Sequence, residues 1–192
     1  MDFNEIIYTK EEGVATITLN RPHALNVLTD TMDAEWVAAI QDAKADPEVR
    51  VLVVTGAGRA FCAGASPRNL AQRQGSNLPP EEFFPAAQHW YRMAQRWVPV
   101  ATALRDLHKP YLGAINGAAV GAGMDLACMC DIRIASDQAR FGTAYVRMGT
   151  TPAQGGSFYL PRLVGLARAS ELLWTGRLID AQESLQIGLV SQ

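Results

Sequence analysis

The chain has 192 residues, of which 48% are hydrophobic, and its formal net charge is -2. This length and apolar content suffice for one well-cored domain, so we expect a single unit over residues 1–192. The basic residues are scattered along the chain, which argues against a nucleic-acid footprint and against a polybasic membrane surface.

The cysteines indicate a reducing compartment. There are three, Cys62, Cys128 and Cys130, and no apolar signal-peptide core opens the chain. An odd number without a leader predicts free thiols in the cytoplasm. Cys128 and Cys130 lack a histidine or a second cysteine pair at metal-binding spacing, so we expect apolar packing and no metal site.

The first third of the chain predicts a hairpin followed by a parallel crossover. Glu5 to Lys10 and Val14 to Leu19 are extended runs around a Glu-Gly turn. Thr29 to Lys44 has helical spacing of its apolar residues, and Val49 to Val54 is a β-branched run typical of a buried strand. The order strand, helix, strand favours parallel pairing.

The remaining segments alternate between polar loops and helical patterns. Ser66 to Glu82 is rich in proline and polar residues and predicts a surface loop, and Phe83 to Leu107 predicts a long helix. Further along we expect a short strand at Arg140 to Gly142, a loop at Gly149 to Gly156, and helices at Ser157 to Val164, Leu166 to Thr175 and Asp180 to Ile187.

The stretch from Lys109 to Ser136 organises the chain. It predicts a strand at Tyr111 to Ile115, a turn at Asn116-Gly117, then a helix and another strand. The glycines after the turn leave the start of the helix almost without side chains. Its free N–H groups can then meet an anion, or an oxygen that becomes negative during a reaction. The alternative is tight packing of helix on sheet.

A second strand also runs into small residues. Val49 to Val54 is followed by Thr55-Gly56-Ala57-Gly58 and by Phe61 to Ser66. Because ligands bind at the carboxyl edge of α/β sheets, two such strand ends can place two backbone N–H groups side by side.

Five segments together resemble the enoyl-CoA hydratase/isomerase (crotonase) superfamily. They are NRPHALN (20–26), VLVVTGAGRAFCAGA (51–65), INGAAVGAGMDLACMCDIRIAS (115–136), FGTAYVRMGTTPAQGG (141–156) and LVGLARASELLWTGRLIDAQESLQIGLV (163–190). The resemblance implies an α/β crotonase-like spiral of β-β-α units, with the C-terminal helical region largely missing after Gln192. It also implies a homotrimer or hexamer, an acyl-CoA substrate, and no cofactor besides the coenzyme A that belongs to the substrate.

The resemblance assigns roles to individual residues. The backbone N–H groups of Ala65 and Ala122 would stabilise the enolate formed from a coenzyme A thioester. The expected substrate-binding residues are Ala24, Ala63, Ser66, Arg68, Gly121, Trp90 and Trp97. Arg68 would meet a phosphate, and its alternative is a solvated loop charge.

Acid-base chemistry is where the sequence departs from the family. Hydratases of the family use two glutamates, and the matching positions here are Asp125 and Tyr145. A third acid position, known in related isomerases, falls at Ala153. We expect Asp125 in the first turn of a helix, with its pKa lowered, either as the base or only as a complement to the helix N-terminus. Tyr145 would donate a hydrogen bond or simply form a pocket wall.

Because only a single carboxylate remains at the expected acid positions, we expect isomerisation or another single-base reaction more than hydration. The resemblance therefore implies a hydratase/isomerase-type enzyme in fatty acid metabolism. The alternatives are a thioester or carbon-carbon hydrolase on the same scaffold, and an acyl-CoA binder without catalysis.

Overall fold

The chain forms two β-sheets with helices packed around them. The computed structural model describes residues 2–65, 99–152 and 154–192. The first sheet has five strands in the order β1 (Ile6–Glu11), β2 (Val14–Leu19), β3 (Val51–Gly56), β5 (Tyr111–Ile115) and β7 (Ile132–Ala135). The second has four, in the order β4 (Ala60–Cys62), β6 (Ala118–Val120), β8 (Arg140–Gly142) and β9 (Ile179–Asp180).

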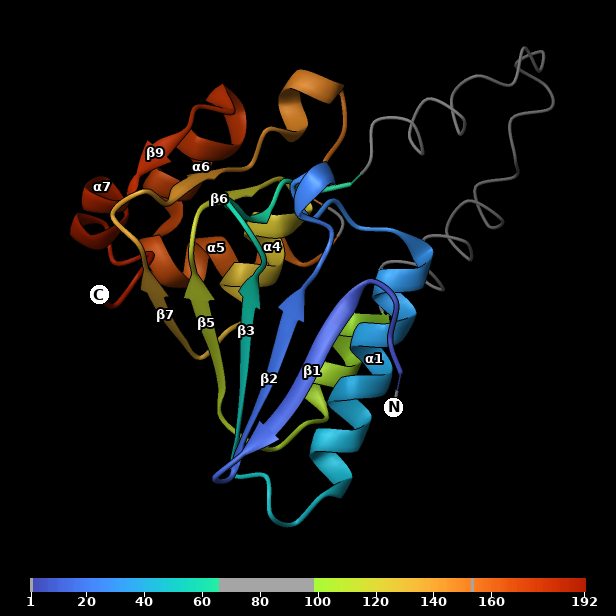
Figure 1. The fold of residues 1–192 in the computed structure, drawn as a ribbon. Helices are drawn as coiled ribbons and strands as arrows, with labels where there is room; N and C mark the ends of the chain where they lie inside the picture. Colours follow the sequence, from blue (N-terminus) through green and yellow to red (C-terminus); the bar gives the residue numbers. More distant parts are fainter. Residues whose placement is uncertain (1, 66–98, 153) are drawn as a thin grey trace, which may run out of the picture.

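Helices lie beside the first sheet and beyond its ends. The α-helices are α1 (Asp30–Ala45), α4 (Ala122–Cys128), α5 (Gly156–Val164), α6 (Leu166–Thr175) and α7 (Ala181–Gln186), and residues 99–105 are also helical. Two 3₁₀ turns, η1 (Pro22–Ala24) and η3 (Tyr145–Met148), also occur within the described residues. Figure 1 shows α1 along the β1–β2 side of the first sheet, while α4 to α7 gather beyond the carboxyl ends of β3 and β5.

The predicted hairpin and crossover are confirmed. β1 pairs antiparallel with β2, and β2 pairs parallel with β3. In β2 and β3 alternate residues are buried, as expected for strands with one face on a core. β5 and β7 continue the parallel pairing, so their carboxyl ends meet at one edge of the sheet.

Helix α1 follows its sequence signals. The Thr29 side chain caps its first turn by accepting a hydrogen bond from the Met32 N–H at 3.0 Å. Met32, Trp36, Ala39, Ile40 and Ala43 are buried on one face of the helix. At the other end, the Lys109 ammonium donates to the carbonyl of Ala43 in the last turn and to that of the C-cap residue Asp46, which also accepts from the Val49 N–H.

The strand-turn-helix-strand prediction for Lys109 to Ser136 was incomplete. A short strand, β6, stands between the Asn116-Gly117 turn and α4, and β4 forms in the small-residue stretch before Ala65. Both are three residues long, so neither shows a periodic pattern in the sequence. β4 pairs parallel with β6, and β6 with β8.

The turn after α4 is fixed by Asp131. Its carboxylate accepts from the Tyr111 N–H at 2.8 Å, and its own N–H donates to the Tyr111 carbonyl at 2.7 Å. The last residues of the chain then lie along β7. The Ser191 N–H donates to the Arg133 carbonyl, and the Ala135 N–H donates to the Gln192 carbonyl, both at 2.8 Å.

The C-terminal helices agree with the prediction. The Asp180 carboxylate caps α7 by accepting from the Glu183 N–H at 2.8 Å. The loop predicted at Ser66 to Glu82 and most of the helix predicted at Phe83 to Leu107 lie outside the described residues. Across the ranges that the structure describes, no helix combines the length and the apolar character that a membrane span requires.

Asn26 ties the loop after β2 to the start of the second sheet. The side chain is fully buried, and its Oδ1 accepts from the Arg21 N–H at 2.8 Å. Its Nδ2 donates to the carbonyls of Ala57 at 2.9 Å and Ala60 at 2.8 Å. Two chain segments more than 30 residues apart therefore share one buried amide.

We predict that Asn26→Ala lowers the free energy of unfolding by about 2 kcal/mol, because buried polar groups of the backbone lose their partner. Urea unfolding of the variant and the wild type measures this difference. Asn4→Ala, at an exposed position, is the control and should change the free energy by less than about 0.5 kcal/mol. Equal stability of Asn26→Ala and the wild type would contradict the prediction.

Candidate active site

Two glycine-rich segments meet where β3 and β5 end. A Cβ atom on Gly117 would lie 2.2 Å from the Arg59 carbonyl oxygen, and one on Gly123 would lie 2.0 Å from the Cys62 carbonyl oxygen. These distances leave no room for any side chain, so the close approach requires glycine at both positions. The turn after β5 and the start of α4 are thereby held against the backbone of β4.

The proposed donors, the backbone N–H groups of Ala65 and Ala122, lie close to these glycine contacts. A Cβ atom on Gly64 would come within 3.5 Å of the Ala122 nitrogen, so the residue before Ala65 packs against that amide. Gly121 precedes α4 with a φ of 57°, which turns the chain so that Ala122 begins the helix. No backbone carbonyl within the described ranges accepts from the Ala122 N–H. The two amides thus lie in neighbouring chain segments.

Asp125 lies in the first turn of α4 and is almost completely buried, with 1% of its surface exposed. The Tyr145 hydroxyl donates to its Oδ2 at 2.7 Å, and the Gln154 N–H donates to the same oxygen at 3.4 Å. The Gly156 N–H also bonds to this carboxylate. The structure therefore brings together the two residues predicted for acid-base work, and it surrounds the carboxylate with three donors.

The expected pKa of Asp125 was wrong in direction. Burial away from water raises the pKa of this carboxyl from 3.8 to about 6, although the bonds from Tyr145, Gln154 and Gly156 oppose the shift. The expectation of a lowered pKa rested on the helix N-terminus, whose effect is small beside the loss of hydration. The same burial raises the pKa of the Tyr145 hydroxyl, which therefore stays protonated and acts as a donor.

The sequence reasoning did not select Gln154 and Gly156. A Cβ atom on Gly156 would lie 2.1 Å from Asp125 Oδ1, so glycine at this position makes room for the carboxylate. Gln154 is buried with 5% of its surface exposed. Their one sequence signal is the Gly155-Gly156 pair at the start of α5, which marks a close backbone approach without naming the partner.

Three of the predicted substrate-binding residues are placed by the structure. Ala24 ends η1, the Ala63 N–H donates to the Leu25 carbonyl at 3.0 Å, and Gly121 precedes α4. The loop after β2 thus runs beside the segment after β4. The other four predictions, Ser66, Arg68, Trp90 and Trp97, lie outside the described residues, as does Ala153.

Cys128 and Cys130 are buried in the core, as the sequence predicted, and the thiol of Cys62 is buried as well. Burial raises the pKa of the Cys62 and Cys128 thiols to about 12, and it also raises that of Cys130. Such thiols stay protonated and unreactive at neutral pH. Searched over its described part, the chain shows no group of three histidine, cysteine or acidic side chains that could hold a metal ion.

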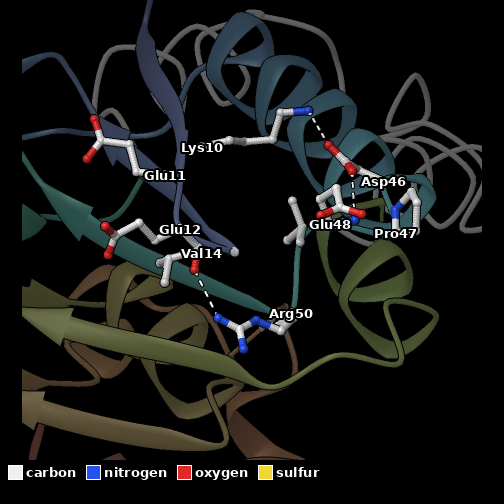
Figure 2. A pocket seen from close by; sticks show the side chains of 10 residues that line it. Lys10, Glu11, Glu12, Val14, Asp46, Pro47, Glu48 and Arg50 are labelled. Carbon is white, nitrogen blue, oxygen red and sulfur yellow. Dashed lines mark hydrogen bonds and ion pairs between the residues drawn. The ribbon is translucent and has the colours of Figure 1, made fainter.

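An open surface pocket lies at the other end of the first sheet, where β2 and β3 begin. Figure 2 shows that its basic side chains already have partners. The Lys10 ammonium donates to the Asp46 carboxylate at 2.7 Å, and the Arg50 guanidinium donates to the Glu12 carbonyl at 3.0 Å. This pocket faces away from the carboxyl edge where Asp125 lies, so it is not part of the candidate active site.

Comparison with known proteins places this geometry in a family. Residues 9–192 match the family model described as enoyl-CoA hydratase/isomerase. The chain belongs to the enoyl-CoA hydratase/isomerase family. The α/β crotonase-like fold expected from the sequence is thereby confirmed, together with the family resemblance on which it rested.

Relatives of both reaction types are similar to this family member. A crotonyl-CoA hydratase of Syntrophomonas wolfei is 38% identical over all of this chain and 70% of its own length. A trans-2-decenoyl-[acyl-carrier-protein] isomerase of Streptococcus mutans is 36% identical over 99% of this chain and 69% of its own. Among solved structures, an enoyl-CoA hydratase subunit from Geobacillus kaustophilus superposes on this chain with a TM-score of 0.85 and 37% sequence identity. The match covers 100% of this chain and 69% of that one.

The contact between Tyr145 and Asp125 predicts a measurable pKa. Replacing Tyr145 by phenylalanine removes a donor that stabilises the ionised carboxylate, so the pKa of Asp125 should rise from about 6 by about one unit. The ¹³Cγ shift of labelled aspartate, followed by NMR across pH and assigned with Asp125→Asn, measures it. Tyr159→Phe is the matched control and should leave the titration in place. An unchanged or lower pKa in Tyr145→Phe would show that the bond does not stabilise the carboxylate.

Proposed function

We propose that this protein is an enzyme of hydratase or isomerase type that acts on an acyl-CoA thioester. The observation that carries the proposal is the buried Asp125 carboxylate, which accepts from the Tyr145 hydroxyl and lies in α4, the helix whose first N–H belongs to Ala122. A base and an oxyanion donor on one short helix are what enolate chemistry requires. Membership of the family supports the same reading.

The thioester oxygen would lie between the N–H groups of Ala65 and Ala122. Negative charge develops on this oxygen when the enolate forms, and fixed donors stabilise it without reorganisation. Losing one donor from such a pair costs about 3 kcal/mol of transition-state stabilisation. Because both donors are backbone groups, the glycine contacts that fix the two segments matter more than the alanine side chains.

Asp125 would move the proton. With a pKa of about 6, the carboxyl is mostly ionised at pH 7, yet its conjugate acid can return the proton later. In isomerisation it would take a proton from C2 of a 3-enoyl thioester and return it to C4. In hydration it would take a proton from water as the water oxygen bonds to C3 of a 2-enoyl thioester, and it would then return this proton to C2 of the resulting enolate. Neither route needs a cofactor, since coenzyme A is part of the substrate.

The finer expectations from the family resemblance stay predictions. They are the substrate-binding roles of Ala24, Ala63, Ser66, Arg68, Gly121, Trp90 and Trp97, assembly as a homotrimer or hexamer, and a cytoplasmic location. The apposition of the Ala63 amide and the loop that contains Ala24 supports the roles of these two residues.

We predict that Asp125→Asn abolishes conversion of 2-enoyl-CoA and 3-enoyl-CoA, because the amide cannot accept the proton. Mass-resolved chromatography of short and medium substrates follows hydration, isomerisation and release of coenzyme A. In the wild type, kcat/KM should rise with pH through about 6, since Asp125 acts only when ionised.

Asp137→Asn, which changes an exposed aspartate, is the control and should keep full activity. Release of free coenzyme A by the wild type would instead indicate a hydrolase. Tight acyl-CoA binding without any conversion would indicate a binder. Full activity of Asp125→Asn would refute the proposed role of the carboxylate.

A further inference from the structure

Gln154 is a buried polar residue next to the Asp125 carboxylate. It lies in the loop between η3 and α5, and its N–H donates to Asp125 Oδ2 at 3.4 Å. The following residues, Gly155 and Gly156, start α5, and the second of them packs directly against the same carboxylate. The backbone of Gln154 is therefore fixed at the edge of the carboxylate site.

Within the described residues, no group donates to the side-chain oxygen of Gln154. Its Oε1 is buried, and among the residues that the structure places it accepts no hydrogen bond. A buried acceptor without a donor destabilises the folded state, so packing alone does not account for glutamine here. The terminal torsion of a glutamine side chain is soft, and a rotation can turn the oxygen toward an incoming donor.

The chemistry of the site indicates the donor. Asp125 and Gln154 Oε1 are both acceptors, and the backbone of Gln154 adjoins the carboxylate. With the Gln154 side chain turned toward Asp125, the two would suit a molecule with two O–H groups to give. Water is such a molecule, and it is the co-substrate of hydration. The sequence indicated only one carboxylate for holding water, and Gln154 supplies an acceptor that does not depend on a second acid.

We propose that Gln154 Oε1 holds the water that adds to C3 of a 2-enoyl thioester, and the hydroxyl that this addition creates. One O–H of the water donates to Gln154, and the other gives its proton to Asp125 while the oxygen bonds to C3. The C2–C3 double-bond electrons move into the enolate, and C2 then takes the proton that Asp125 received, which leaves Asp125 ionised again. This inference rests on the proposed function and assigns the site to hydration.

Binding tests the inference without turnover. By calorimetry the wild type should bind 3-hydroxybutyryl-CoA about tenfold more tightly than butyryl-CoA, since one extra hydrogen bond forms. Gln154→Met has similar length and no acceptor oxygen, and it should bind the two ligands equally. A hydroxyl preference that persists in Gln154→Met, or that the wild type lacks, would overturn the inference.

Turnover gives the second measurement. In Gln154→Met the ratio of the rate of 2-enoyl-CoA hydration to that of 3-enoyl-CoA isomerisation should fall at least tenfold. The kcat of hydration should change more than its KM. Gln154→Glu keeps an acceptor oxygen and should recover part of the hydration, and Ser157→Ala, exposed in the same loop-helix junction, is the control. An unchanged ratio in Gln154→Met would contradict the inference.

Thermal unfolding separates this role from a structural one. Gln154→Met removes an unpaired buried acceptor, so its Tm should equal or exceed that of the wild type. A clearly lower Tm with a normal hydroxyl preference would show that Gln154 only supports the fold. If the wild type binds both acyl-CoA ligands but converts no enoyl-CoA, the proposed function fails while the binding comparison still decides on Gln154. Binding of neither ligand would overturn both.

Discussion

The close approach of two backbone segments is the constraint on which the candidate site depends. Gly117 and Gly123 lie so near the carbonyls of Arg59 and Cys62 that any side chain would collide with them. This approach brings the end of β4 to the start of α4, and it leaves the Ala122 N–H without a backbone acceptor among the described residues. A free N–H at such a point costs stability, and the site can use it for a developing negative charge.

Burial of Asp125 is the second cost that the structure carries. Its pKa of about 6 means that the ionised form is disfavoured in the folded protein relative to the unfolded chain. Stability from this group is therefore full below the unfolded pKa of 3.8 and is lost as the pH rises through about 6. The donors from Tyr145, Gln154 and Gly156 limit that loss. A carboxylate kept at this pKa can both take and return a proton near neutral pH, which is what an isomerase or hydratase needs.

Sequence patterns predicted the long elements, because their periodicity and caps are local. The hairpin, α1 with its Thr29 cap and α7 with its Asp180 cap all follow from neighbouring residues. The short strands β4 and β6 did not, since three residues carry no period and their pairing depends on distant glycines. Tyr145 and Asp125 were selected by family position, but the direction of the Asp125 pKa required knowing how deeply the carboxylate is buried. Gln154 was missed because only the folded structure shows that its side-chain oxygen is buried without a donor among the described residues.

The most direct test of the proposed enzyme is the state of a bound thioester carbonyl. Crotonyl-CoA labelled with ¹³C at C1 can be bound to Asp125→Asn, which should hold the substrate without converting it, and its C=O stretch read by difference infrared spectroscopy. If the N–H groups of Ala65 and Ala122 both donate to this oxygen, the stretch shifts to lower frequency than in water. A stretch at or above the frequency in water would contradict the proposed oxyanion site.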